Sequence, residues 1–105
     1  MSVSFEVVNI VASNAAVSVK VEGGSHSVEE VHPNDGDYLS LEQCQGVVGG
    51  YIEHVRMPMY PNHAMLVNEM GRIENMELNE WASRLALRPI VGDVIVCDVC
   101  MLESS

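Results

Sequence analysis

Alternating hydrophobic and polar positions predict β-strands in the first third of the chain. In the segment Ala16 to Glu22, three valines alternate with polar residues, which is the period of a strand with one buried face. The segment Val3 to Val11 is also rich in β-branched residues, and "SNA" between the two segments is typical of a turn. We therefore predict a hairpin from these two segments. The following "HSVEEVH" is either a short third strand or an exposed arm.

A start signal and a stop signal predict a first helix over Leu41 to Val48. Ser40 is followed three residues later by Gln43, a pattern in which two side chains reciprocally satisfy free backbone N–H groups at a helix start. Gly49 and Gly50 end the segment, because glycine readily adopts the positive φ that closes a helix.

A second helix is predicted over "EWASRLAL", after Asn79. Asparagine is a good N-cap, and Pro89 stops the helix on the other side. The candidates for inward-facing side chains are Trp81, Leu85 and Leu87.

The remaining segments predict further strands. "YIEHVRM" alternates as a strand does, and the prolines of "PMYPN" place the next residues in a loop or at a sheet edge. "AMLVNEMGRIENM" predicts a hairpin that turns at Asn68 to Gly71, and the long apolar run of "DVIVCDVCML" predicts a central strand. We therefore expect one α+β domain over residues 1–105, with a mainly antiparallel sheet of five or six strands and two short helices on one face.

Charge and cysteine content narrow the function classes. Fifteen acidic residues against five basic ones give a formal net charge of −10, which disfavours direct nucleic-acid binding. The acidic surface is either an ordinary solvated one or suited to a basic partner, including a nucleic-acid enzyme whose groove accepts a phosphate mimic. Three cysteines argue against a disulfide scaffold, and no leader or membrane-length apolar run is present, so we expect a cytoplasmic protein without membrane contact.

The strand "YIEHVRM" carries the first candidate site. Residues two apart on a strand share a face, so Tyr51 and Glu53 lie on one side and His54 and Arg56 on the other. Glu53 and His54 therefore cannot form a direct acid/base dyad, and we assign no catalytic residue, although a small hydrolase using them is kept as an alternative. Glu53 is either a structural carboxylate, with a partner such as Arg72, or part of a shallow pocket.

Two sets of residues follow as candidate binding surfaces. An oligomer that sequesters a small nucleotide-like signal would use arginines for phosphate, and its candidate lining is Tyr51, Glu53, Arg56, Asn68 and Arg72. The methionines concentrated between positions 57 and 76 form either a contact patch or a gap-filling core. The candidate protein interface is Met57, Met59, Tyr60 and His63.

No metal site or cofactor is predicted. Cys97 and Cys100 have a spacing that can hold zinc, but on a continuous strand residues three apart point to opposite faces, so we interpret them as small buried hydrophobes. The four histidines lack ligand spacing, and the chain contains no phosphate loop and no nucleophile elbow.

The order "VGGYIE", "LVNEMG" and "RPIVGDVIV" resembles an uncharacterised family of small proteins from phages, plasmids and mobile elements. Residues 39–98 form the family-like core, and residues 1–38 are expected to be a variable β-hairpin extension. The resemblance implies a mobile-element accessory protein of unassigned activity. We therefore expect a non-enzymatic phage-type binding protein, a counter-defence inhibitor of a host protein that acts through its acidic surface. A homodimer could form through the N-terminal hairpin or the proline-flanked edge.

Overall fold

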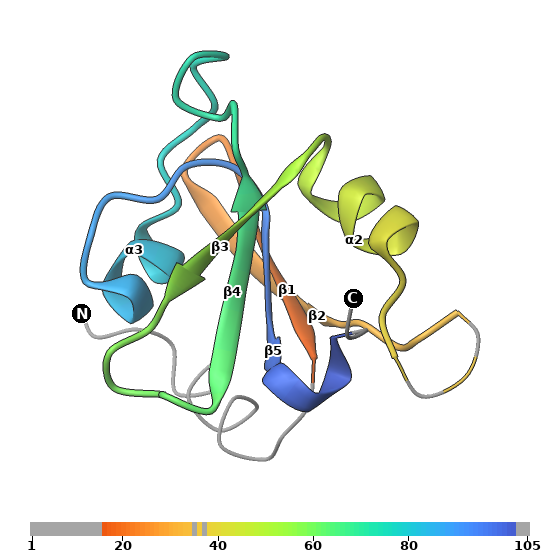
Figure 1. Ribbon diagram of the computed structural model, residues 1–105. Helices are drawn as coiled ribbons and strands as arrows, with labels where there is room; N and C mark the ends of the chain where they lie inside the picture. The colour runs from red at the N-terminus through yellow and green to blue at the C-terminus, as the bar shows by residue number, and fades with distance from the viewer. Residues whose placement is uncertain (1–15, 35, 37, 103–105) are drawn as a thin grey trace.

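A five-stranded antiparallel sheet forms the centre of the computed structural model, which describes residues 16–34, 36 and 38–102. The strand order is β2-β1-β5-β4-β3, and every pair of neighbours is antiparallel (Figure 1). The strands are β1 Val17–Glu22, β2 Ser25–Glu30, β3 Ile52–Arg56, β4 His63–Asn68 and β5 Val94–Asp98. The predicted α+β architecture is confirmed, and β5 is the central strand that its apolar run indicated.

The first hairpin joins β1 to β2. Gly23 and Gly24 form its turn with φ of 58° and 83°, values that glycine adopts without steric cost. The register places Val19 opposite Val28, so "HSVEEVH" contains a strand and is not an exposed arm. The predicted strand Val3 to Val11 lies outside the described residues. The neighbours of β1 in the described part are β2 and β5.

The second hairpin joins β3 to β4, and it corrects one prediction. Both edges of β4 are occupied, by β3 and β5, so no strand returns beside it after Asn68. The chain instead makes successive turns from residue 69 to residue 75, in which the Gly71 N–H donates to the Asn68 carbonyl at 3.1 Å. The turn was predicted correctly, but turns that satisfy their own backbone groups replace the second strand.

The helix α2 has the predicted bounds, Leu41–Val48. The Ser40 hydroxyl accepts the Gln43 N–H at 3.0 Å, and Gly49 ends the helix with φ of 84°. The reciprocal half of the capping pattern is absent. The Gln43 amide instead donates to the His32 carbonyl and accepts the Asn34 N–H at 3.1 Å, which fastens the preceding loop to the helix.

The helix α3 spans Glu80–Ala86 after its predicted cap, Asn79, whose side-chain oxygen accepts the Ala82 N–H at 3.1 Å. Leu85 is buried and Trp81 is half-buried, as predicted. Leu87 is 62 % exposed, because it leaves the helix in the left-handed conformation with φ of 58°.

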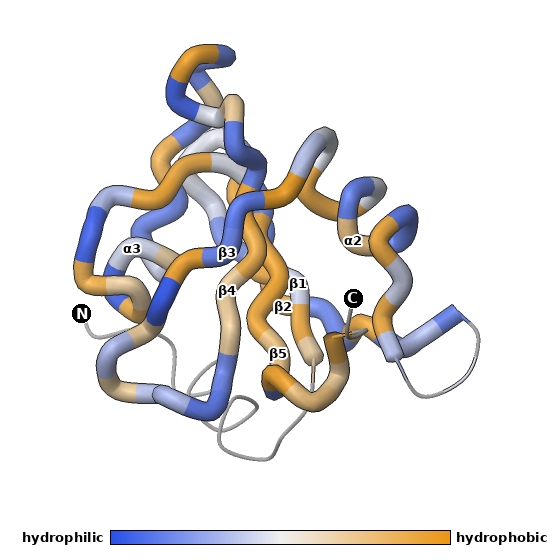
Figure 2. Tube along the Cα trace, in the orientation of Figure 1, coloured by the Kyte–Doolittle hydropathy of each residue, from blue (hydrophilic) through white to orange (hydrophobic). Residues whose placement is uncertain are grey.

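The two helices lie on opposite faces of the sheet, not on one face as predicted (Figure 1). Around α3, Ala82 and Leu85 pack on the face formed by side chains such as Val17, Met65 and Val96. Around α2, Cys44 packs on the other face. That face is formed by Leu66, Ile95 and Cys97. The reason is the composition of β5, which is apolar on both sides and therefore needs cover on both (Figure 2).

None of the helices in the described residues is long and apolar enough to cross a membrane.

Candidate functional site

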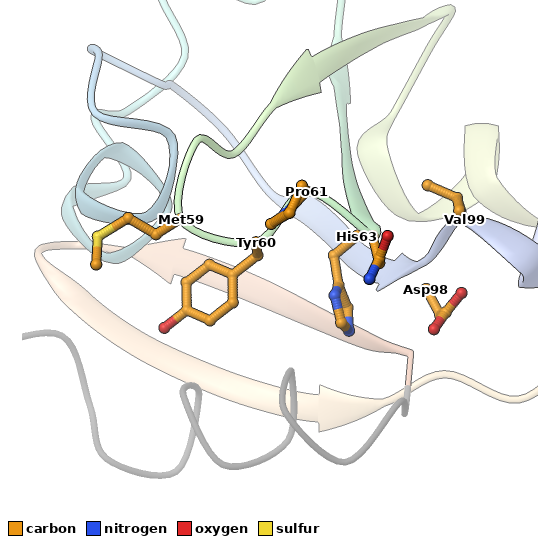
Figure 3. A pocket seen from close by; sticks show the side chains of 7 residues that line it. Met59, Tyr60, Pro61, His63, Asp98 and Val99 are labelled. Carbon is orange, nitrogen blue, oxygen red and sulfur yellow. The ribbon is translucent and has the colours of Figure 1, made fainter.

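Two adjoining hollows lie where the loop between β3 and β4 meets the end of β5. The first hollow has a volume of about 450 Å³ and is lined by Met59, Tyr60, Pro61, Asn62, His63, Asp98 and Val99 (Figure 3). The second hollow has a volume of about 510 Å³ and is lined by His54, Val55, Arg56, Met57, Pro58, Pro61, His63, Ala64 and Val99. The two hollows share Pro61, His63 and Val99 in their linings, and together they are called the depression at the end of the sheet.

The loop that shapes both hollows is fixed by its own backbone hydrogen bonds. The Tyr60 N–H donates to the Met57 carbonyl at 2.9 Å, and the His63 N–H donates to the Tyr60 carbonyl at 3.0 Å. The Val99 N–H then donates to the Asn62 carbonyl at 3.0 Å, which ties the loop to the residues after β5. These successive turns hold the loop against the 3-10 helix η1, Val99–Met101.

The four residues predicted as a protein interface divide between core and surface. Met57 is 2 % exposed and packs in the core beside α3, so it is not available to a partner. Met59 is 72 % exposed, at the rim of the first hollow. Tyr60 packs partly against the core and meets the ring of His63 edge-on, with 6.3 Å between ring centroids. The methionine-rich segment therefore contributes both to the core and to a surface.

His63 has an unusual environment at the centre of the depression. Its Nε2 is buried and has no hydrogen-bond partner among the described residues, whereas buried polar atoms in folded proteins normally have one. Asp98 faces His63 across the strand pair and accepts the Cys100 N–H at 2.9 Å. Hydrogen bonds from Cys100, through its side chain and its backbone, lower the pKa of Asp98, and the same side-chain bond raises the pKa of the Cys100 thiol.

The five residues predicted to bind a nucleotide-like ligand do not share one cavity in the described part of the chain. Glu53, Asn68 and Arg72 border a third hollow of only about 50 Å³, far below the roughly 300–1,000 Å³ typical of ligand pockets. Arg56 lines the second hollow on the other face of β3, and the side chain of Tyr51 is exposed. Glu53 is partnered by Arg88 at 3.9 Å, and not by Arg72 as considered.

Asn68 is a structural residue. Its side-chain amide donates to the Val48 carbonyl at 3.2 Å, and its side-chain oxygen accepts the Met70 N–H at 2.8 Å. A Cβ added to Gly50 would lie 2.9 Å from the same amide nitrogen, so a larger residue here would displace the buried Asn68 side chain. The sequence motifs "VGGY" and "VNEMG" are thus in contact, and they pack the end of α2 against the end of β4.

Glu53 and His54 lie on opposite faces of β3. Glu53 is in register with Val67, which belongs to the core on the α3 side, and His54 is in register with Leu66, which belongs to the core on the α2 side. The two side chains cannot act together on one substrate atom.

The cysteines do not assemble a metal site in the described residues, which contain no group of three or more potential ligands. Cys97 is buried at the end of β5, where burial raises the pKa of its thiol to about 12. Cys100 is exposed in η1, because Asp98 caps a 3-10 turn and ends the strand that was predicted to continue.

The sequence analysis did not identify three residues that line the first hollow, Asn62, Asp98 and Val99. The charge of Asp98 within an apolar run was the available signal that the strand ends there.

The family model described as a domain of unknown function (DUF3846) matches residues 16–103. The match includes β1 and β2, which lie in the 1–38 segment expected to be an extension. No curated protein and no solved structure matches the chain.

Proposed function

The chain belongs to the DUF3846 family, and we propose that it acts without catalysis, as a binding protein that docks a protein partner on the first hollow. The observation that carries this proposal is the exposure of two apolar side chains beside a concave surface. Met59 is 72 % exposed and Val99 is 49 % exposed, and both line the first hollow. An apolar side chain of a partner can become buried in such a hollow.

The composition of the first hollow supports a protein partner. Tyr60 supplies aromatic surface, Met59 supplies a flexible thioether that adapts to varied shapes, and Asn62 and Asp98 add polar groups. Aromatic residues and methionine are enriched at the centres of protein interfaces, whereas polar groups are typical of their rims.

The charge of the chain favours a basic partner. With a formal net charge of −10, the protein attracts basic surfaces at long range and repels acidic ones. The contribution of exposed charges is screened by salt, so the complex should form more slowly and bind less tightly as ionic strength increases.

Within a phage or mobile element, we propose that this partner is a host protein and that the chain is a counter-defence inhibitor. The support is the resemblance of "VGGYIE", "LVNEMG" and "RPIVGDVIV" to small mobile-element proteins, together with the acidic charge. A homodimer is part of the proposal, because β2 and β3 are edge strands with only one neighbour each among the described strands.

A matched pair of variants tests the docking surface. Affinity capture from host lysate is carried out with the wild-type protein, with Met59→Asp and with Ile73→Asp. Ile73 is 73 % exposed, nearly the same as Met59, but it lies in the turns after β4 and not in the hollow. We expect a reproducible partner that is lost with Met59→Asp and retained with Ile73→Asp. Equal capture by both variants would contradict the proposal.

A further inference from the structure

We propose that the second hollow binds a small molecule carrying a phosphate or carboxylate group, and that the guanidinium of Arg56 holds this group. The first support is the character of the lining. Its titratable side chains, His54, Arg56 and His63, are all basic, and none of the described lining residues is acidic. The chain has fifteen acidic residues and only five basic ones, so a hollow whose titratable lining residues are basic differs locally from the overall charge; Asp98, which faces His63, belongs to the adjoining first hollow.

The second support is that Arg56 has no ion-pair or hydrogen-bond partner among residues 16–34, 36 and 38–102. By contrast, Lys20 pairs with Glu29 at 2.9 Å, and Arg88 lies 3.9 Å from Glu53. An arginine offers five N–H donors in a planar fork that matches the oxygens of a phosphate or carboxylate. The whole donor set of Arg56 is therefore available to a ligand.

The third support is the placement of His54 beside Arg56. Residues two apart on β3 share a face, and their Cα atoms are roughly 7 Å apart. One anionic group can lie between the two side chains.

The size and surroundings of the hollow define the ligand class. A volume of about 510 Å³ lies within the roughly 300–1,000 Å³ range of small-molecule pockets. Pro58, Pro61 and Val99 supply apolar surface against which the body of the molecule can pack. The net charge of −10 repels a nucleic acid strand, so a compact ligand with one anionic group is favoured over a polyanion.

The test is a titration of the ¹⁵N-labelled full chain with phenyl phosphate, with benzoate and with uncharged benzyl alcohol. We expect saturable shifts of the His54, Arg56 and His63 amide signals with at least one of the two anions, and none with the alcohol. Comparison of the two anions identifies the preferred group. Arg56→Gln should weaken binding about tenfold or more, because a charge-assisted hydrogen bond is lost.

The matched control is Arg72→Gln, which removes the same charge from the rim of the third hollow and should leave the affinity within about twofold of wild type. Both arginines are exposed, so both variants should fold, and thermal melts check this. Three results would overturn the proposal: no saturable shift with either anion, equal binding of benzyl alcohol, or an Arg56→Gln variant that binds as the wild type does.

Discussion

The side-chain amide of Asn79 donates a hydrogen bond to the carbonyl of Val19 at 2.9 Å, although the two residues are 60 positions apart in the chain. The same amide also donates to the Gly92 carbonyl at 2.9 Å, and Asn79 is completely buried. One residue thus caps α3 and joins the helix both to β1 and to the segment that leads into β5.

Replacing Asn79 with alanine should therefore be strongly destabilising. The change removes the buried hydrogen bonds to the Val19 and Gly92 carbonyls and the cap bond to the Ala82 N–H, and we expect a loss of about 2–4 kcal/mol in the free energy of unfolding. Urea denaturation followed by circular dichroism measures this. The control is Ser40→Ala, which removes only one cap bond and should cost about 1 kcal/mol. Equal losses in the two variants would show that the bonds to Val19 and Gly92 contribute little.

The close approach of Gly50 to Asn68 gives a second prediction. A Cβ at position 50 would lie 2.9 Å from the Asn68 amide nitrogen, so Gly50→Ala should lower the free energy of unfolding by about 1–3 kcal/mol. Gly46 lies inside α2, where an added Cβ would meet nothing within 4 Å, and Gly46→Ala should raise stability by about 0.5–1 kcal/mol. Thermal unfolding of both variants tests whether the stability changes in opposite directions.

Glu77 and the Gly23–Gly24 turn give a third prediction. The carboxylate of Glu77 accepts the Gly23 N–H at 2.9 Å and the Gly24 N–H at 2.5 Å. In Glu77→Gln only one side-chain oxygen can accept, so hydrogen exchange of these two amides should become faster. The loss of stability should stay below about 1 kcal/mol because the bonds are exposed. Glu74→Gln is the control, and exchange that accelerates equally in both variants would contradict the assignment.

Thiol reactivity gives a fourth prediction, with a defined pH direction. Burial raises the pKa of Cys97 to about 12 and also raises the pKa of Cys44, so in the folded protein both thiols stay protonated and shielded at mildly alkaline pH. Iodoacetamide should therefore modify Cys100 first and the other two only after denaturation.

The rate at Cys100 should respond to Asp98. The hydrogen bond to Asp98 raises the pKa of the Cys100 thiol and so reduces its thiolate fraction at any given pH. In Asp98→Asn that pKa should move back towards its ordinary value, and the pH profile of alkylation should shift to lower pH. Mass spectrometry over a pH series measures the profile. An unchanged profile would show that Asp98 does not control this thiol.

Local signals predicted the elements, whereas long-range contacts decided their arrangement. The bounds of α2 could be predicted because Ser40 and Gly49 act within one turn of the helix ends. The choice of face could not, because an apolar stripe on a helix does not say which side of a sheet it covers. The turn after Asn68 could be predicted from the sequence. The strands that pair with β4, however, are β3 and β5, and no local signal excluded a third strand after the turn.

The candidate site was predicted only in part, for the same reason. The alternation of β3 correctly separated Glu53 from His54 and placed Arg56 on the His54 side. The depression itself forms between the loop at 57–62 and the residues after β5, and the hydrogen bond from Val99 to Asn62 joins them. No local sequence pattern predicts that the loop and the residues after β5 lie side by side, so Asp98 and Val99 were not among the predicted residues.

The position of β5 also bears on how the protein is made. The β1–β2 and β3–β4 hairpins can each form early during translation, but in the sheet of the described residues it is β5 that lies between them, and the ribosome delivers β5 after both. Until Asp98 has left the exit tunnel, the nascent chain carries two unconnected hairpins with exposed apolar faces. Release or stalling before that point should yield a chain recognised by chaperones and proteases.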